Sequence, residues 1–222
     1  MTLPNFIIIG AQKCGTTSLY RYLTKHPQIL PATKKEVHFF DLNFDKGMNW
    51  YYSHFPQKEI PNQTITGEAS PYYIFHPHAP QRISQSLPDI KLILLLRNPV
   101  DRAVSHYYHN RQFGKSREPL SFEQAIQQEP SRIEPEIDKI MADENYKSLP
   151  HRYYSYLSRG IYIEQLLRWL KFFPRKNLLI LKSEELWENP RQKMKQVWNF
   201  LGVPNRPQEI YKNTIIESTI MI

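Results

Sequence analysis

A short apolar run followed by a glycine-bounded loop constrains this chain more than any other segment. Residues 6–9 are Phe-Ile-Ile-Ile, which predicts a buried strand that stops at Gly10. A helix is expected from Gly15 to about His26, because Pro27 follows and ends it. A loop in that position presents backbone N–H groups at the positive end of the helix dipole, which suits a phosphate group. The segment therefore predicts an α/β fold with an anion site after its first strand.

The loop differs from the common phosphate-binding loop in the place of its lysine. The common pattern is Gly-x-x-x-x-Gly-Lys-Ser/Thr. Gly10 and Gly15 keep the glycine spacing, but Thr16 stands where the lysine is expected, and Lys13 lies inside the loop. The hydroxyl that would bind magnesium therefore lacks its usual neighbour. We expect a phosphate ester that is bound and handled without a metal.

Length and composition predict one basic domain. The 222 residues suit a single domain spanning 1–222, and the formal charge of +8 suits either an anionic ligand or an excess of surface lysine. Cys14 is the single cysteine, which rules out an intrachain disulfide. No signal peptide and no apolar run of ~18 residues is visible, so we expect a cytoplasmic protein without a membrane span. No basic-aromatic motif points to a nucleic-acid partner.

Strand and helix patterns alternate along the rest of the chain. Strands are expected at 29–31, 65–68, 91–96 and 177–181. Helices are expected at 79–87, at 98–113 with Asn98 as cap, around the apolar stripe Ile163, Leu166, Leu167 and Leu170, and at 189–201 with Asn189 as cap and Gly202 as stop. Segment 114–150 lacks a clear period and is expected to be a lid on the acceptor side or a set of peripheral helices.

This alternation predicts a three-layer, P-loop-like α/β domain with a central parallel sheet flanked by helices. Ligands of such sheets bind at the carboxyl ends of the strands. The 10–17 loop, Glu68 and Arg97 all come at strand ends. We therefore expect them to converge on one cleft.

Three segments together resemble the sulfotransferases that use 3′-phosphoadenosine 5′-phosphosulfate (PAPS), and most closely the heparan sulfate sulfotransferase-like branch with its bacterial members. Residues 10–18 resemble that family's 5′-phosphosulfate loop. Residues 35–41, Lys-Glu-Val-His-Phe-Phe-Asp, with 46–51 after them, resemble its acceptor-side segment. Residues 96–108, which begin Leu-Arg-Asn-Pro, resemble its 3′-phosphate motif. The resemblance spans about residues 5–205.

The resemblance implies a role for each matching residue. Glu36 would be the general base, Lys13 would stabilise the bridging oxygen of the leaving nucleotide, and His109 would lie near the sulfuryl group. Arg97 and Ser105 would bind the 3′-phosphate. The other cofactor-binding positions would be Gln12, Cys14, Gly15, Thr16, Thr17, Ser18 and Tyr162, and the acceptor-binding positions would be His38, Asp41 and Glu68. We expect partial burial to raise the pKa of Glu36 toward a useful value.

Several of these residues also allow a purely structural interpretation. Lys13 could be a solvated loop lysine, the hydroxyls of Thr16–Ser18 could cap the helix, and Cys14 fits a small loop residue better than a nucleophile. His38 and Tyr162 could be packing residues, and His109 could lie on the surface of its helix.

The chain departs from the family pattern in two places. The Glu-Lys-Ser/Thr motif of the glycosaminoglycan enzymes is Glu68-Ala69-Ser70 here, so a lysine expected near the acceptor is absent. Residues 206–222 contain no glycine and no basic residue after Lys212, which indicates a diverged or truncated C-terminal segment.

We therefore expect a sulfotransferase that moves a sulfuryl group from PAPS to a hydroxyl or amine of a glycan, glycolipid or small metabolite, with no metal required. Two alternatives stay open. One is a nucleotide-kinase-like phosphotransferase, and the other is a relative that binds the nucleotide without turnover.

Overall fold

The structure is a computed structural model of the chain and describes residues 3–57, 63–114 and 117–206. Five strands are present: β1 (Phe6–Gly10), β2 (Ile29–Pro31), β3 (Ile65–Ala69), β4 (Lys91–Leu96) and β5 (Leu178–Lys182). The helices of the first half are α1 (Thr16–Leu23), α2 (Phe39–Leu42), α3 (Gly47–Tyr52), α4 (Ala79–Ser86) and α5 (Pro99–Arg111). Those of the second half are α6 (Phe122–Gln127), α7 (Glu129–Ala142), α8 (Leu149–Tyr153), α9 (Tyr162–Leu170), α10 (Ser183–Glu188) and α11 (Pro190–Leu201).

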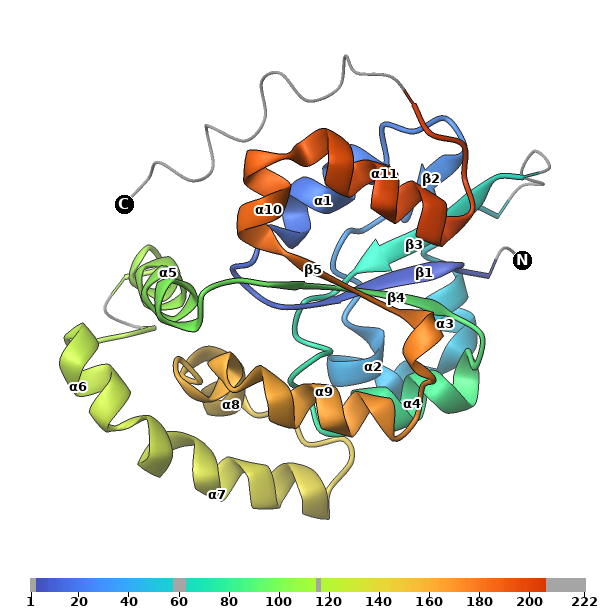
Figure 1. Cartoon of the computed structure of the whole chain (residues 1–222). Coiled ribbons are helices and arrows are strands. Elements are labelled where there is room, and N and C mark those ends of the chain that lie inside the picture. Colours follow the sequence, from blue (N-terminus) through green and yellow to red (C-terminus); the bar gives the residue numbers. More distant parts are fainter. Residues whose placement is uncertain (1–2, 58–62, 115–116, 207–222) are drawn as a thin grey trace.

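All five strands form one parallel sheet in the order β2-β3-β1-β4-β5. Helices α1, α10 and α11 cover one face, and α2, α4 and α9 cover the other (Figure 1). The expected three-layer domain with a central parallel sheet is confirmed. Every residue of β1 is buried, which is why its sequence is a continuous apolar run.

Gly67 lets β3 lie close to β1. A Cβ atom at this position would be 2.3 Å from the backbone oxygen of Phe6, a distance that real contacts do not show. The Tyr20 hydroxyl of α1 donates to the Gly67 carbonyl at 3.0 Å and fastens the helix to this strand. A glycine is therefore required where two central strands and a covering helix meet.

Local signals set most helix ends. The Asn98 side chain accepts from Val100 N at 2.9 Å, so the cap of α5 is confirmed, and Gly202 ends α11 with φ +79°. Asn189 makes no side-chain cap hydrogen bond, so that part of the prediction is wrong. Helix α1 ends at Leu23, earlier than expected, and the N–H and the hydroxyl of Thr24 both donate to the Tyr20 carbonyl, at 2.9 and 3.0 Å.

Helix α9 forms where expected, but three of the four leucines and isoleucines of its apolar stripe face outward, and only Leu166 packs against the core. Ile163, Leu167 and Leu170 are 61%, 56% and 41% exposed. The buried side of the helix holds Trp169, whose indole N–H donates to the Ile74 carbonyl at 3.1 Å. A tryptophan buries more area than a leucine and needs a partner for its N–H, so its placement decides how the helix is turned.

Segment 114–150 is built mainly as α6 and α7, which lie outside the two layers that cover the sheet (Figure 1). Residues 207–222, expected to be a diverged or truncated end, lie outside the described residues. Among the described helices, none has the length and apolar character needed to cross a bilayer.

Four buried histidines make the fold sensitive to acid. His26, His76, His106 and His151 are at most 2% exposed. Burial, with arginines nearby, lowers the pKa of each imidazole. Each ring is then neutral in the folded chain but is protonated near pH 6.5 in the unfolded chain. The stability that they contribute is complete above about pH 6.5 and is lost as the pH falls below it.

We expect His106→Leu to reduce this acid sensitivity, because neither ring nitrogen of His106 has a hydrogen-bond partner within the described part of the chain. At pH 5, protonation of one histidine in the unfolded chain is worth about 2 kcal/mol. The drop in unfolding free energy between pH 7 and pH 5 should therefore shrink by about 2 kcal/mol in the variant. Urea denaturation at both pH values measures it. An equal drop in both proteins would contradict this origin of the acid sensitivity.

Candidate active site

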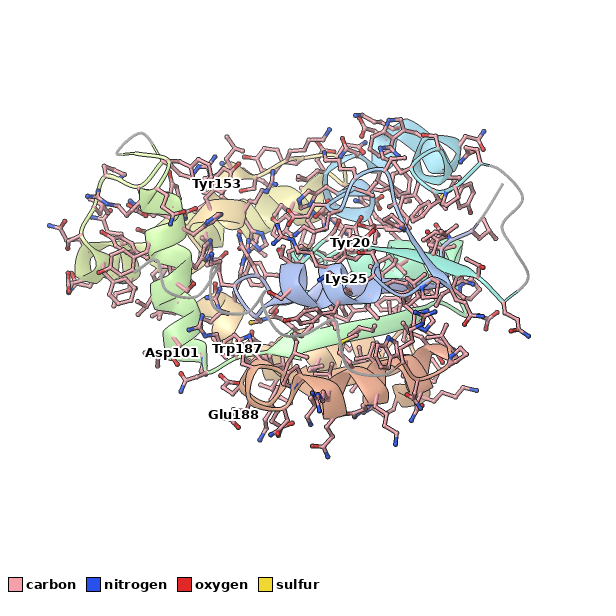
Figure 2. All side chains as sticks on the ribbon, turned by 90° about the horizontal axis from the view of Figure 1, so that it is seen from above. Tyr20, Lys25, Asp101, Tyr153, Trp187 and Glu188 are labelled. Carbon is pink, nitrogen blue, oxygen red and sulfur yellow. The ribbon has the colours of Figure 1, made fainter. Side chains whose placement is uncertain are left out.

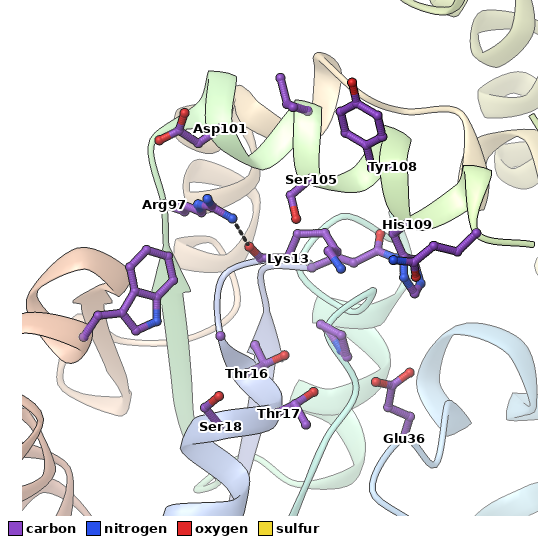
Figure 3. A pocket seen from close by; sticks show the side chains of 16 residues that line it. Lys13, Thr16, Thr17, Ser18, Glu36, Arg97, Asp101, Ser105, Tyr108 and His109 are labelled. Atoms are coloured by element: carbon purple, nitrogen blue, oxygen red, sulfur yellow. Dashed lines mark hydrogen bonds between the residues drawn. The ribbon is translucent and has the colours of Figure 1, made fainter. Parts of the chain in front are cut away.

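A cavity of about 610 Å³ opens at the carboxyl ends of the central strands. The loop after β1, the end of β4 and the inner face of α5 form most of its wall. Figure 3 shows Lys13 near its middle, with Arg97 toward one end and Glu36 and His109 toward the other. The lining residues are Gln12, Lys13, Gly15, Thr16, Thr17, Ser18, Glu36, Pro71, Arg97, Asp101, Val104, Ser105, Tyr108, His109, Gln112 and Trp187.

The loop after β1 has the backbone of an anion site. Lys13 and Gly15 have φ angles of +68° and +84°. Left-handed residues in such a loop can turn successive N–H groups toward one side. Thr16 and Thr17 begin α1, so their N–H groups belong to the first turn of the helix and lack an acceptor within it. The expected combination of loop amides, hydroxyls and helix dipole is present on the cavity wall.

Side chains behind the loop hold it in place. The Ser183 hydroxyl donates to the Cys14 carbonyl at 2.7 Å, and the buried Arg159 donates to the Gln12 side chain. Tyr162 donates to the Arg97 carbonyl at 2.9 Å, and its hydroxyl is 3.9 Å from the Cys14 Sγ atom. Cys14 and Tyr162 do not line the cavity, so their contacts support the loop from inside the protein.

Arg97 marks one end of the cavity. Its guanidinium lies over the Trp187 ring, 5.1 Å from the centroid, and donates to the Lys13 carbonyl at 3.4 Å. Its Nε atom is buried without a partner among the described residues. Trp187 packs also against the loop, because a Cβ at Gly15 would be 3.4 Å from the indole nitrogen. Figure 2 shows Trp187 near Asp101, at the start of α5. This end can take an anionic group, and it offers an aromatic wall.

Glu36 marks the other end and is held by two cations. Lys35 Nζ lies 2.5 Å from Glu36 Oε1 and donates to the Thr17 hydroxyl at 2.9 Å, so it joins the carboxylate to the loop. His38 Nε2 is 3.3 Å from Glu36 Oε2, and His38 Nδ1 is 2.7 Å from Asp41 Oδ2. Arg152, from α8, reaches the same His38 Nε2 at 3.3 Å.

These contacts reverse the expected ionisation of Glu36. Burial favours the neutral carboxyl, but His38 and Lys35 outweigh it and hold the pKa of Glu36 at about 2. Burial likewise disfavours a charged His38, but Asp41 and Glu36 raise its pKa to about 9. The expectation of a raised pKa at Glu36 is therefore wrong, because the two neighbours supply more stabilisation to the ion than burial removes. At neutral pH the two residues form an ion pair.

Lys13 near the middle of the cavity and His109 toward the Glu36 end both have lowered pKa values. Burial and the positive charge of Arg97 lower the pKa of Lys13. Burial, Lys13 and Arg117 lower the pKa of His109, while Glu36 opposes them. A neutral imidazole therefore stands across from an ammonium whose charge has no carboxylate beside it among the described ion pairs. An anion bound in this space would stabilise the charged forms of the basic side chains around it.

The structure separates the expected residues into two groups. Eleven line the cavity or form its loop, namely Gln12, Lys13, Gly15, Thr16, Thr17, Ser18, Glu36, Arg97, Ser105 and His109, with Cys14 directly behind them. His38 contacts Glu36 from behind and Asp41 contacts His38, while Tyr162 contacts Arg97 from behind. Glu68 is fully buried, so its carboxylate contacts neighbouring side chains and not an acceptor.

Several side chains of the site were not expected from the sequence, and three of them contact the expected residues directly. The others line the cavity, namely Pro71, Asp101, Val104, Tyr108 and Gln112. Lys35 precedes Glu36, so the segment that resembles the family already contained it. Trp187 and Arg152 come from α10 and α8, far from every motif, and no local pattern indicates them. No cluster of three or more histidine, cysteine, aspartate or glutamate side chains suited to a metal occurs among the described residues.

Comparison with known proteins identifies the family. The sulfotransferase domain family matches residues 3–219, nearly the whole chain. The chain belongs to the sulfotransferase family. It is 32% identical to the membrane-associated sulfotransferase kil1 of Dictyostelium discoideum, over 91% of this chain and 57% of that protein. It is 34% identical to human heparan sulfate glucosamine 3-O-sulfotransferase 3B1, over 90% of this chain and 46% of that protein.

A solved structure supports the same assignment. The crystal structure of a sulfotransferase from Alicyclobacillus acidocaldarius matches with a TM-score of 0.73 and 34% identity, over 96% of this chain and 87% of that one. The resemblance noted in the sequence is confirmed. The chain spans about half the length of the two relatives from Dictyostelium and human.

We predict that Cys14 is unreactive in the folded protein. The thiol is buried, and burial raises its pKa to about 11 despite Arg102 and Tyr162 nearby. At pH 8 about 10⁻³ of the thiol is then ionised, and only the thiolate reacts. Iodoacetamide at pH 8, followed by mass spectrometry, should leave native Cys14 unmodified but modify it in urea. Equal rates in both states would contradict the buried, protonated thiol.

Proposed function

We propose that the chain transfers a sulfuryl group from PAPS to a hydroxyl or an amine of an acceptor. One observation carries the proposal: the Lys13 loop, the Arg97–Ser105 pair and the Glu36 carboxylate all line one cavity. A donor with a 5′-phosphosulfate and a 3′-phosphate needs two anion sites, and an acceptor that loses a proton needs a base beside the transferred group. The human relative, named for heparan sulfate glucosamine, supports a glycan acceptor, and a glycolipid or small metabolite would present the same reacting groups.

The arrangement of the cavity gives the donor a direction. Arg97 and Ser105 are placed to bind the 3′-phosphate, and the loop amides with Thr16 and Thr17 to bind the 5′-phosphate. The sulfuryl group must face Glu36, so the purine is directed to the Trp187 end.

In this proposal each step of the transfer is assigned to a particular side chain. The acceptor oxygen or nitrogen attacks sulfur while the bond from sulfur to the 5′-phosphate oxygen breaks. Glu36 takes the acceptor proton, and Lys13 stabilises the charge that develops on the departing oxygen. His109 lines the cavity and would donate to a sulfuryl oxygen, while Lys35 would keep Glu36 joined to Thr17 of the loop. The low pKa of Glu36 keeps it ionised at neutral pH, so it can accept the proton. The same two cations that fix its position also weaken it as a base.

We propose that this chemistry needs no metal. Lys13 and Arg97 supply the positive charge that magnesium supplies in phosphoryl transfer. We also propose a cytoplasmic location and no nucleic-acid partner. A single cysteine, which leaves no intrachain disulfide, and the lack of a basic-aromatic motif support these two proposals.

Nucleotide choice tests the proposed function. We expect the product nucleotide, 3′-phosphoadenosine 5′-phosphate, to bind more tightly than AMP, because a charge-assisted contact with the 3′-phosphate is worth about 1.5–3 kcal/mol, or roughly 10- to 100-fold in affinity. Calorimetry with and without magnesium measures this preference.

Two variants locate the preference. Arg97→Ala should bring the two nucleotides to similar affinity, while Arg191→Ala, an exposed arginine of α11, should leave the preference intact. Tighter, magnesium-dependent binding of ATP would favour a nucleotide-kinase-like phosphotransferase. Binding without turnover of any acceptor would favour a relative that only binds the nucleotide.

Glu36→Gln should lower turnover by roughly 10²-fold or more, which is the usual size of general-base catalysis. The amide cannot take the acceptor proton, but the nucleotide contacts are elsewhere, so affinity for 3′-phosphoadenosine 5′-phosphate should stay the same. Sulfate transfer and calorimetry measure the two effects. Glu164→Gln, an exposed glutamate of α9, is the matched control. Transfer by the Glu36 variant at the control's rate would rule out this carboxylate as the base.

A further inference from the structure

The buried carboxyl group of Glu68 accepts hydrogen bonds from several side chains but forms no ion pair among the described residues. Its side chain is 0% exposed. Oε1 accepts from the hydroxyls of Tyr73 at 2.9 Å and Tyr51 at 3.3 Å, and Oε2 accepts from the Ser70 hydroxyl at 2.6 Å. No basic side chain of the described residues pairs with it. Burial raises the pKa of Glu68 to about 7, while its hydrogen bonds from Ser70 and Tyr73 oppose this shift. A carboxyl group is costly to bury in this setting, and its hydrogen bonds offset part of that cost.

Three successive backbone N–H groups are tied to this one carboxylate. Val37 N donates to Glu68 Oε2 itself at 3.4 Å. His38 N donates to the Ser70 hydroxyl at 3.0 Å, and that hydroxyl donates to Glu68. Phe39 N donates to the Tyr73 hydroxyl at 2.8 Å, which also donates to Glu68. These hydrogen bonds thus hold the segment that begins directly after Glu36 against the end of β3 and the residues that follow it.

This segment has an unfavourable backbone at its centre. His38 has φ +54° and ψ +42°, the left-handed region, which costs a residue with a Cβ about 1–2 kcal/mol. This conformation turns the imidazole so that Nε2 meets Glu36 and Nδ1 meets Asp41. The hydrogen bonds of the Val37, His38 and Phe39 N–H groups oppose relaxation of the His38 backbone to a more favourable region of φ and ψ.

We propose that Glu68 and Ser70 are positioning residues that hold residues 37–39 from inside the protein and thereby keep His38 against Glu36. The catalytic part of this inference rests on the proposed function. The proposal gives the motif Glu68-Ala69-Ser70 a role that needs no lysine. Glu68 and Ser70 act on the base, Glu36, through residues 37–39 inside the protein, and neither residue contacts the acceptor.

The structure shows which charged groups face the His38–Glu36 pair. His38 meets Glu36, Asp41 and Arg152, and Glu36 also meets Lys35. If the backbone of His38 relaxes, the imidazole loses its carboxylate partners while Arg152 remains. The pKa of His38 must then fall and that of Glu36 must rise, because each loses its opposite charge.

The test compares Ser70→Ala with Thr66→Val. Both remove a buried hydroxyl, Thr66 within β3 and Ser70 directly after it, but Thr66 donates to the Leu30 carbonyl at 2.9 Å, away from the site. The first readout needs no turnover: the pKa of His38 followed by NMR, with the signal assigned by its loss in His38→Gln. We expect Ser70→Ala to lower this pKa by about one unit or more, and Thr66→Val to leave it unchanged.

The second readout is sulfate transfer. Ser70→Ala should lower turnover about 10-fold or more while affinity for 3′-phosphoadenosine 5′-phosphate stays within about twofold, and Ser70→Thr, which keeps the hydroxyl, should restore both readouts. Glu68→Gln should behave as Ser70→Ala does, and if it fails to fold, the serine variants carry the test. If Ser70→Ala matches Thr66→Val in the His38 titration, the proposal is overturned. If the wild type transfers no sulfate, the proposed function fails, and the titration still decides whether the positioning exists.

Discussion

The parallel pairing of β1 with β3 on one side and β4 on the other is the constraint on which the site depends. Ile8 lies opposite Ala69, and Gly10 lies opposite Leu94. In this register the three strands end at one edge of the sheet. The phosphate loop follows β1, the Glu68–Ser70 segment lies at the end of β3, and Arg97 ends β4. Residues that are far apart in the sequence therefore meet at one cavity, as parallel sheets require of their ligand sites.

The two ends of the cavity differ in how their charges are paired. Toward one end Arg97 lies near Lys13, and burial together with the positive charge of Arg97 lowers the pKa of Lys13. At the other end Glu36 is already paired with Lys35 and His38. An incoming dianion would relieve repulsion at the first end and leave the second end intact. This asymmetry explains how one cavity can attract a nucleotide and still keep an ionised base a short distance from it.

The sequence predicted what depends on neighbours along the chain. The strands, the Asn98 cap and the phosphate loop were foreseen because apolar runs, glycines and prolines act locally. The low pKa of Glu36 was missed because it depends on the left-handed turn at His38, which only the contacts of β3 explain. Trp187 lines the cavity from α10, and the long-range packing of Trp169 turned α9 outward. Both depend on tertiary contacts that no spacing in the sequence encodes.

The direction of the bound nucleotide is the central claim, and a crystal structure with 3′-phosphoadenosine 5′-phosphate tests it most directly. We predict the 5′-phosphate on the amides that follow Lys13, the 3′-phosphate within hydrogen-bond distance of Arg97 and Ser105, and the purine toward Trp187. The space beside Glu36 should stay open for the acceptor. A nucleotide in the opposite direction, with its 3′-phosphate beside Glu36, or one bound outside this cavity, would contradict the account.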